Sequence, residues 1–321
     1  MGADMKLVFL DRKTLGFDTD VSELSRFGTV EIYDFISDEE AGLYLAEADV
    51  VITNQNKLNA LNLSKAGKLK LICQTGTGYN NLDIEYCRER GIAVTNVPAY
   101  SAVSVAQHTF SMLFYLISHA GYYDAYVKDG RYSTREELDP SKDFYELEGK
   151  TWGIIGLGDI GRKVAQYAQG FGCNVVYYSS SGENRSHTLR RMELTELLMQ
   201  SDIVSVHAPM NERTRGLIGL KELQMMKSDA YLLNLGRGGI IVERDLAKAL
   251  AEDLIAGAGL DVFEEEPVKS ENPLLSIGIR EKLYMTPHIG YGSREARVRL
   301  MKTICGNIDS FLKGGKQNRI V

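Results

Sequence analysis

The sequence predicts an α/β protein built from two doubly wound parallel sheets, each in its own domain. Two observations carry this prediction. Short apolar runs of strand length alternate with helical runs over residues 6–96, and again from residue 151 onward. A glycine-rich turn, Gly156-Leu157-Gly158-Asp159-Ile160-Gly161, opens the second series. Strands that alternate with helices form parallel sheets covered by helices on both faces, so each series predicts one sheet.

The first series and the segment after it account for residues 1–150. Strands are expected at 6–10, 30–33, 50–53, 69–74 and 93–96, and helices at 38–48 and 82–90. Residues 101–119 are mostly apolar without proline or glycine, which predicts a long buried helix. Residues 121–150 are polar and aromatic and contain Gly130 and Pro140, so we expect an irregular segment there.

The second series supplies the larger sheet. Strands are expected at 151–155, 174–178, 203–206, 230–234, 256–260 and 283–286, with helices at 193–199 and 243–251 and an amphipathic helix at 293–312. Because the glycine turn opens this series, the dinucleotide-binding domain is expected at 101–290. Residues 1–100, joined by 291–321, are expected to form the substrate domain, with a ligand in the cleft between the two domains.

The glycine turn has the context that a dinucleotide site needs. It follows a strand-like run and opens a helical run, so the helix N-terminus faces an anion. Gly156 allows the tight turn, Gly158 lets the pyrophosphate approach, and Gly161 lets the helix pack on the strand. Asp159 and Ile160 begin that helix. The flanking pattern disfavours the alternative, an ordinary strand–turn–helix with packing glycines.

The expected ribose contact departs from the usual pattern. An acidic residue ordinarily ends the second strand, where it bonds the ribose hydroxyls. Here the strand 174–178 ends in Ser179-Ser180-Ser181-Gly182. Ser179 can bond a ribose hydroxyl without repelling a 2′-phosphate, and Arg185 is close enough in sequence to contact one. NAD(H) and NADP(H) therefore both stay open, as does a solvated loop position for Arg185.

Arg237, Glu266 and His288 form the candidate catalytic set. Each comes shortly after a predicted parallel strand, at the edge where open α/β sheets bind ligands. A guanidinium there can hold a carboxylate through two hydrogen bonds, and a histidine can carry the proton that accompanies a hydride. A carboxylate beside the histidine orients it and favours its protonated form. Singly, Glu266 and His288 also fit a solvated acidic run and a satisfied histidine.

The other histidines fit supporting positions. His108 and His119 lie on the predicted helix 101–119, where a core or interface role is favoured, and His187 lies in a polar loop. His207 ends a strand in Val206-His207-Ala208-Pro209, so it is expected to touch the dinucleotide. Paired metal-ligand spacings and clustered cysteines are absent, so no metal site is expected.

Composition narrows the class of protein. The chain has 321 residues, 44% of them apolar and 25% charged, as in globular proteins. A net charge of −6 without a basic stripe predicts no nucleic-acid partner. No apolar run reaches the roughly 20 residues that span a bilayer, and no secretory signal begins the chain. Four cysteines without a C-x-x-C pair predict buried reduced thiols and a cytoplasmic protein.

Several runs taken together resemble the D-isomer-specific 2-hydroxyacid dehydrogenases, over essentially the whole chain. The runs are Gly76-Thr77-Gly78-Tyr79-Asn80-Asn81-Leu82-Asp83, residues 156–161, 234–239 and 259–267, and Pro287-His288-Ile289-Gly290. The resemblance implies a flavodoxin-like substrate domain, a Rossmann cofactor domain and a homodimer with residues 101–150 in its interface. Ser179 departs from the family's usual aspartate, which opens the cofactor preference.

The resemblance also implies roles for single residues. Arg237, Glu266 and His288 are then the catalytic residues, and Gly76, Thr77 and Gly78 bind the substrate carboxylate through backbone N–H groups. Asp261 contacts the nicotinamide. The full set expected to bind the cofactor is Gly156, Gly158, Asp159, Ile160, Gly161, Ser179, His207, Pro209 and Asp261.

The implied activity is hydride transfer between a nicotinamide cofactor and a small D-2-hydroxy acid. Residues 97–101 and 104–110 most resemble the glycerate dehydrogenases, also called hydroxypyruvate reductases, which favours D-glycerate and hydroxypyruvate, or glycolate and glyoxylate. The alternatives are D-lactate dehydrogenase, D-3-phosphoglycerate dehydrogenase and a non-enzymatic, dinucleotide-sensing protein that resembles the corepressors with this fold.

Overall fold

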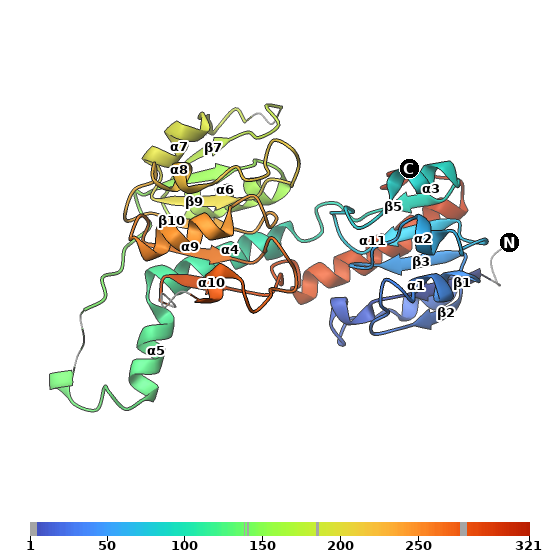
Figure 1. Ribbon diagram of the computed structural model, residues 1–321, viewed down its shortest axis with the longest axis horizontal. Helices are drawn as coiled ribbons and strands as arrows, with labels where there is room; N and C mark the ends of the chain where they lie inside the picture. The colour runs from blue at the N-terminus through green and yellow to red at the C-terminus, as the bar shows by residue number, and fades with distance from the viewer. Residues whose placement is uncertain (1–4, 138, 140, 184–185, 277–280) are drawn as a thin grey trace. The chain divides into compact units, whose positions relative to one another are not determined.

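The chain folds into two compact units. The computed structural model describes residues 5–137, 139, 141–183, 186–276 and 281–321. Unit 1 comprises Met1–Ser101 and Gly292–Val321, and unit 2 comprises Ala102–Tyr291 (Figure 1).

Unit 1 is built on a parallel five-stranded sheet in the order β2-β1-β3-β4-β5. Its strands are β1 (Met5–Phe9), β2 (Gly28–Ile32), β3 (Val50–Thr53), β4 (Leu71–Gln74) and β5 (Ala93–Thr95). Every residue of β3, β4 and β5 is buried, as expected when helices cover both faces of a parallel sheet. This strand order is that of flavodoxin, so the predicted fold of this unit is confirmed.

The helices of unit 1 are short except for the last. They are α1 (Ala41–Leu45), α2 (Ala60–Leu63), α3 (Ile84–Glu89) and α11 (Arg294–Leu312). The Ser293 hydroxyl caps α11 by accepting from the N–H of Ala296 at 3.2 Å. The segment that follows α11 in the chain lies beside β5, where the N–H of Ile320 donates to the carbonyl of Val94 at 2.8 Å.

Unit 2 is built on a parallel seven-stranded sheet in the order β12-β11-β10-β9-β6-β7-β8. Its strands are β6 (Thr151–Ile155), β7 (Asn174–Tyr178), β8 (Arg190–Arg191), β9 (Ile203–Val206), β10 (Tyr231–Asn234), β11 (Gly257–Leu260) and β12 (Leu283–Met285). The chain leaves β6 toward β7 and later returns to the other side of β6 as β9. This is the strand order of a dinucleotide-binding sheet, which confirms the predicted Rossmann fold. The two-residue strand β8 was not predicted.

Helices cover both faces of this sheet. They are α4 (Ala102–Ile117), α6 (Asp159–Gly170), α7 (Leu194–Gln200), α8 (Leu220–Leu223), α9 (Glu243–Ala251) and α10 (Pro273–Ser276). Neighbouring residues of β10 face opposite sides, since Leu232 belongs to one apolar cluster and Leu233 to another. The second cluster contains Phe110 of α4 and Trp152, whose ring centroids lie 4.7 Å apart. This packing seats α4 against the sheet.

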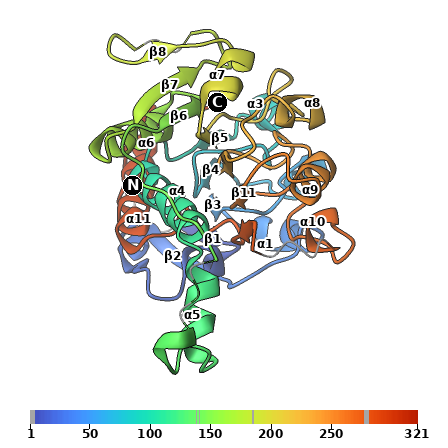
Figure 2. The ribbon, with the colours of Figure 1, turned by 90° about the vertical axis from the view of Figure 1, so that its left-hand side faces the viewer.

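The segment after α4 corrects a prediction. Residues 121–150 were expected to be irregular, but Ala120–Lys128 forms helix α5, which projects away from the sheet of unit 2 (Figures 1 and 2). An Asp124–Lys128 ion pair at 2.7 Å supports this helix. None of its residues is buried, so it has no apolar stripe for periodicity to detect.

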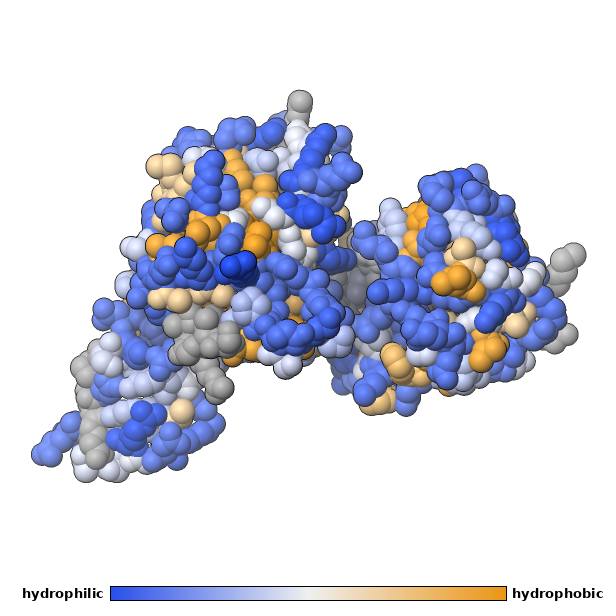
Figure 3. Space-filling model, in the orientation of Figure 1, coloured by the Kyte–Doolittle hydropathy of each residue, from blue (hydrophilic) through white to orange (hydrophobic). Residues whose placement is uncertain are grey.

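Polar residues dominate the visible surface of both units, with apolar residues in scattered patches (Figure 3). All four cysteines are buried and unpaired. Within the described ranges, no helix combines the length and apolar character needed to cross a membrane.

Candidate active site

The candidate site lies at the carboxyl edge of the seven-stranded sheet. Strands β9, β10, β11 and β12 are neighbours and parallel, so the segments that follow them meet at one edge. His207 follows β9, Arg237 follows β10, Asp261 and Glu266 follow β11, and His288 follows β12. Residues distant in sequence are therefore gathered at the edge where open α/β sheets bind ligands.

His288 and Glu266 are in direct contact. Nδ1 of His288 lies 2.7 Å from Oε2 of Glu266, and Oε1 of Glu266 accepts from the N–H of Phe263 at 2.9 Å. The two side chains are 34% and 35% exposed, so a ligand can reach them. Because Glu266 engages Nδ1, the other ring nitrogen, Nε2, is left for a substrate.

The Glu266 carboxylate is held in its charged form. Burial acts to raise the pKa of Glu266, but the hydrogen bond and charge of His288 and the N–H of Phe263 outweigh it, and the pKa lies below its usual value. Glu266 therefore stays ionised at neutral pH, where it orients the His288 ring and stabilises a positive charge on it.

Arg237 stands in a loop braced by Asn234. The side-chain amide of Asn234 donates to the carbonyl of Arg237 at 3.0 Å, and its oxygen accepts from the N–H of Gly236 at 3.1 Å. Nη1 of Arg237 donates to the carbonyl of Gly236 at 2.9 Å. Four further donors remain on the guanidinium, enough for bidentate binding of a carboxylate.

Gly238 allows the Arg237 loop to pack closely against the Glu266 loop. A Cβ built on Gly238 would lie 1.6 Å from the carbonyl oxygen of Phe263, so only glycine fits there. The structure thus pairs His288 with Glu266 directly and packs the Arg237 loop against the loop that carries Glu266. Among the described residues, Arg237 makes no direct hydrogen bond to either partner.

The glycine turn after β6 has the geometry expected for a dinucleotide. Gly156 has φ +96°, and a Cβ there would lie 2.7 Å from the backbone N of Ala208. A Cβ on Gly161 would lie 2.2 Å from the carbonyl oxygen of Gly156. By contrast, a Cβ on Gly158 would meet no atom within 4 Å, so space is open at the N-terminus of α6, which begins with Asp159 and Ile160. This space suits a pyrophosphate.

Two buried polar side chains flank the turn without partners of their own. The Ser179 hydroxyl, after β7, and both ring nitrogens of His207, after β9, have no hydrogen-bond partner in the described structure. Burial lowers the pKa of His207 to about 3, so its ring is neutral at pH 7. Buried polar groups ordinarily find partners, and a bound dinucleotide offers hydroxyl and amide groups for these two. Pro209, two residues on, is exposed.

Two arginines donate hydrogen bonds to the backbone of the segment after β7. Nη1 of Arg213 donates to the carbonyl of Ser181, and Nη1 of Arg191 donates to that of Gly182, each at 3.2 Å. Sequence reasoning missed both, because Arg191 lies in the unpredicted strand β8 and Arg213 lies in the loop after β9. Arg185, the arginine that it proposed, lies outside the described residues.

The carboxylate of Asp261 accepts three hydrogen bonds from other residues of the chain. It accepts from the hydroxyl of Thr286 at 2.6 Å and from the N–H groups of Ile289 at 2.9 Å and Gly290 at 2.8 Å. Two carboxylate oxygens offer about four acceptor positions, so about one remains. The expected contact of Asp261 with a nicotinamide stays a prediction. A second role, in holding the segment of His288, was missed at the sequence level.

The loop Gly76-Thr77-Gly78 follows β4 in unit 1. The carbonyl of Gly76 accepts from the N–H of Val97 at 3.0 Å, and the Thr77 hydroxyl donates to the carbonyl of Val97 at 2.9 Å. Asn96 donates from its side chain to the carbonyl of Thr77 at 2.8 Å. The loop is thus tied to the segment after β5, and its binding of a carboxylate stays a prediction.

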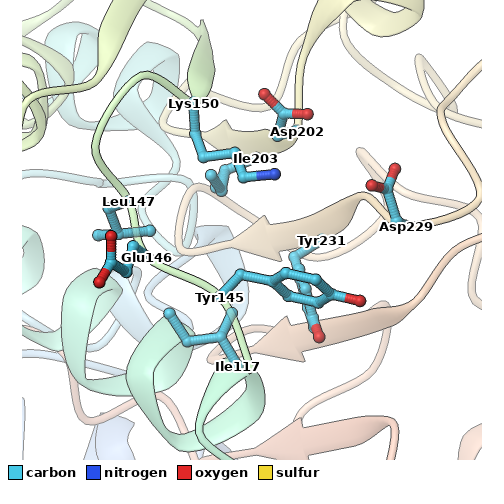
Figure 4. Close-up of a pocket in the computed structure, with 9 residues that line it drawn as sticks. All are labelled: Ile117, Tyr145, Glu146, Leu147, Lys150, Asp202, Ile203, Asp229 and Tyr231. Carbon is cyan, nitrogen blue, oxygen red and sulfur yellow. The ribbon is translucent and has the colours of Figure 1, made fainter. Parts of the chain in front are cut away.

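A small pocket elsewhere in unit 2 is not this site. Figure 4 shows Lys150, Asp202 and Asp229 at its wall, together with Tyr145 and Tyr231. Lys150 precedes β6, Asp202 precedes β9, and Asp229 lies just before β10, so the pocket is at the amino edge of the sheet, opposite His288. In the part of the chain that the structure describes, no cluster of three or more histidine, cysteine or acidic residues can hold a metal ion.

Comparison with known proteins agrees with this geometry. Residues 110–290 match the family described as D-isomer specific 2-hydroxyacid dehydrogenase, NAD binding domain. The chain belongs to this family. It is 35% identical to a hydroxypyruvate reductase of Blautia hydrogenotrophica over 98% of this chain and 99% of that protein.

Solved structures extend the comparison to bound ligands. A D-lactate dehydrogenase from Aquifex aeolicus complexed with NAD and lactic acid is 29% identical, with a TM-score of 0.85 over 98% of this chain and 99% of that chain. An acyclic imino acid reductase in complex with NADPH and D-Arg is 30% identical, with a TM-score of 0.88 over 99% of this chain and all of that chain. The chain is an oxidoreductase of hydroxy and keto acids that uses NAD(H) or NADP(H).

Replacing Gly158 and Gly238 by alanine tests the two loop packings against each other. Gly158→Ala has room for its methyl group, so we expect an unchanged urea midpoint but weaker cofactor binding in a fluorescence titration. Gly238→Ala forces two loops apart and is expected to lose about 1–3 kcal/mol of unfolding free energy. Equal stability of the two variants would contradict the packing, and unchanged cofactor affinity in Gly158→Ala would contradict the placement of the pyrophosphate.

Proposed function

We propose that this chain reduces a small 2-keto acid, hydroxypyruvate or glyoxylate, to the corresponding 2-hydroxy acid. The contact between His288 and Glu266, at the edge of the dinucleotide-binding sheet, carries this proposal because it supplies an oriented proton donor. The 35% identity to a hydroxypyruvate reductase over nearly the whole of both chains supports the choice of substrate.

The proposed mechanism uses three side chains. Arg237 binds the substrate through its guanidinium and polarises the keto oxygen. When bound, the nicotinamide supplies the hydride that reduces the keto carbon. His288 donates a proton from Nε2 to the keto oxygen, which becomes the hydroxyl of the product, and Glu266 stabilises the imidazolium before transfer. Gly156, Gly158 and Gly161 shape the turn that would hold the pyrophosphate.

Replacing His288 by asparagine tests the proton donor. With hydroxypyruvate and reduced cofactor, His288→Asn should lower kcat by about 10²–10⁴-fold, because general acid catalysis is lost, while cofactor affinity is kept. The matched control is His119→Asn, since His119 has φ +49° and His288 has φ +52°, and asparagine tolerates this conformation in both places. Equal kcat values for the two variants would refute the role of His288.

Replacing Glu266 by glutamine tests the pairing of charges. Glu266 is ionised throughout the neutral range because its pKa is lowered, so its removal takes away a fixed negative charge beside His288. In Glu266→Gln the fall of kcat/KM for reduction should therefore begin at lower pH on the alkaline side. The control is Glu265→Gln, whose exposed carboxylate pairs with Lys269 instead. A Glu266→Gln profile that overlays that of the parent would contradict the pairing.

The two arginines that contact the segment after β7 support a preference for NADPH. Ser179 stands where a carboxylate would repel a 2′-phosphate, and Arg191 and Arg213 hold the backbone carbonyls of the same segment. A guanidinium can shift from a neutral carbonyl to a phosphate, which makes a stronger, charge-assisted bond. We therefore assign the 2′-phosphate to these two arginines.

Cofactor kinetics check this assignment. Arg213→Ala should lower kcat/KM for NADPH by roughly 10–150-fold and leave NADH nearly unchanged, since a hydrogen bond to a charged group is worth about 1.5–3 kcal/mol. Arg215→Ala, two residues away in the same loop, is the control and should change neither value. An equal loss with both cofactors in Arg213→Ala would count against the preference.

The proposal extends to assembly and location. Helix α5 buries none of its residues, and Val127 in the helix and Tyr132 just after it are more than half exposed. Helix α5 and the residues that follow it therefore offer a surface for a second copy in a homodimer. Four buried, unpaired cysteines fit a reducing compartment, the cytoplasm. Neither a nucleic acid nor a membrane is part of the proposed function.

A further inference from the structure

A second polar network joins helix α4 to the segment that carries His288. Nε2 of His108, in α4, lies 2.9 Å from Oγ1 of Thr286. The Thr286 hydroxyl in turn contacts Oδ1 of Asp261 at 2.6 Å, and Nε2 of His108 is 3.6 Å from the same oxygen. Asp261 then accepts the N–H groups of Ile289 and Gly290. The network thus ends on the two residues that follow His288.

The protons in this network point in one direction. Burial acts to raise the pKa of Asp261, but hydrogen bonds from its neighbours outweigh it, and the pKa is lowered, so Asp261 is a carboxylate that only accepts. The hydroxyl of Thr286 has one proton and gives it to Asp261. Its oxygen must then accept from His108, so His108 carries a proton on Nε2.

The segment that receives this support has an unfavourable backbone conformation. His288 has φ +52°, in the left-handed region, which is unfavourable for a residue other than glycine. Such conformations persist where the surroundings hold them. Ser104, one helical turn before His108, adds a bond from its hydroxyl to the carbonyl of Gly290 at 2.6 Å. Ser104 and His108, on one face of α4, therefore hold the segments on both sides of His288, through Gly290 and Thr286.

We propose that His108 is a positioning residue, which holds the backbone of 288–290 through Thr286 and Asp261 so that His288 keeps its contact with Glu266. This inference rests on the proposed function, in which His288 donates the proton. His108 itself touches no reacting atom. Its N–H is needed because the buried oxygen of Thr286, whose own proton goes to Asp261, otherwise loses its donor.

Two replacements of His108 separate its hydrogen bond from its bulk. His108→Leu fills similar space without a donor, and we expect kcat to fall on the order of tenfold while KM and cofactor affinity stay close to the parent values. His108→Gln keeps an N–H donor and should restore most of kcat. Similar values for the leucine and glutamine variants would overturn the proposal. Thr286→Val breaks the same network without changing His108 and serves if His108→Leu fails to fold.

A double-variant cycle tests whether His108 acts through His288. In the His288→Asn background, His108→Leu should lower kcat little further, because the group that it positions is gone. Independent, multiplicative losses would show that His108 acts by another route and would overturn the proposal.

Amide hydrogen exchange tests the network without any turnover. The N–H groups of Ile289 and Gly290 should exchange faster in His108→Leu than in the parent, and at the parent rate in His108→Gln. Equal exchange in all three proteins would overturn the proposal. A parent that reduces no 2-keto acid would instead overturn the proposed function, while the exchange rates still decide whether His108 holds this segment.

Discussion

The contact between Nδ1 of His288 and Oε2 of Glu266 depends on two neighbouring parallel strands that end level with each other. In the register of β11 and β12, Leu260 pairs with Met285, so Asp261 and Thr286 are the next residues after the two strands, and the hydroxyl of Thr286 donates to Asp261. That bond places the segments carrying Glu266 and His288 side by side. The proposed chemistry therefore rests on the sheet as much as on the catalytic side chains.

Tight backbone packing keeps these segments in register. Gly238 lets the Arg237 loop approach the carbonyl of Phe263, and Gly290 lies so close to Asp261 that a Cβ would be 2.8 Å from its Oδ2. Asp261 bonds the segment of His288, while the N–H of Phe263, two residues on, bonds Glu266. One short stretch after β11 thus supports both members of the pair. Packing of this kind leaves the backbone little freedom to move at His288, where the proton must be delivered.

Local patterns in the sequence predicted both sheets and the place of the three candidate catalytic residues. Apolar runs gave both sheets, and the positions of Arg237, Glu266 and His288 after strands placed them at one edge. Helix α5 was missed because it buries nothing, and β8 because two residues show no period. His108 was assigned a core or interface role, since its partner Thr286 is 178 residues away and no local pattern connects them. The arginine proposed at the ribose end was Arg185, whereas Arg191 and Arg213 reach that segment only through folding.

A single-turnover experiment tests whether His288 donates the proton. The protein, loaded with NADPH, is mixed with hydroxypyruvate in a stopped-flow instrument, and cofactor oxidation is followed in the parent and in His288→Asn. We expect both proteins to bind NADPH equally. The parent should oxidise it in one fast phase, and the variant should be slower by two orders of magnitude or more, on the order expected for loss of a general acid. Equal rates would contradict proton donation by His288.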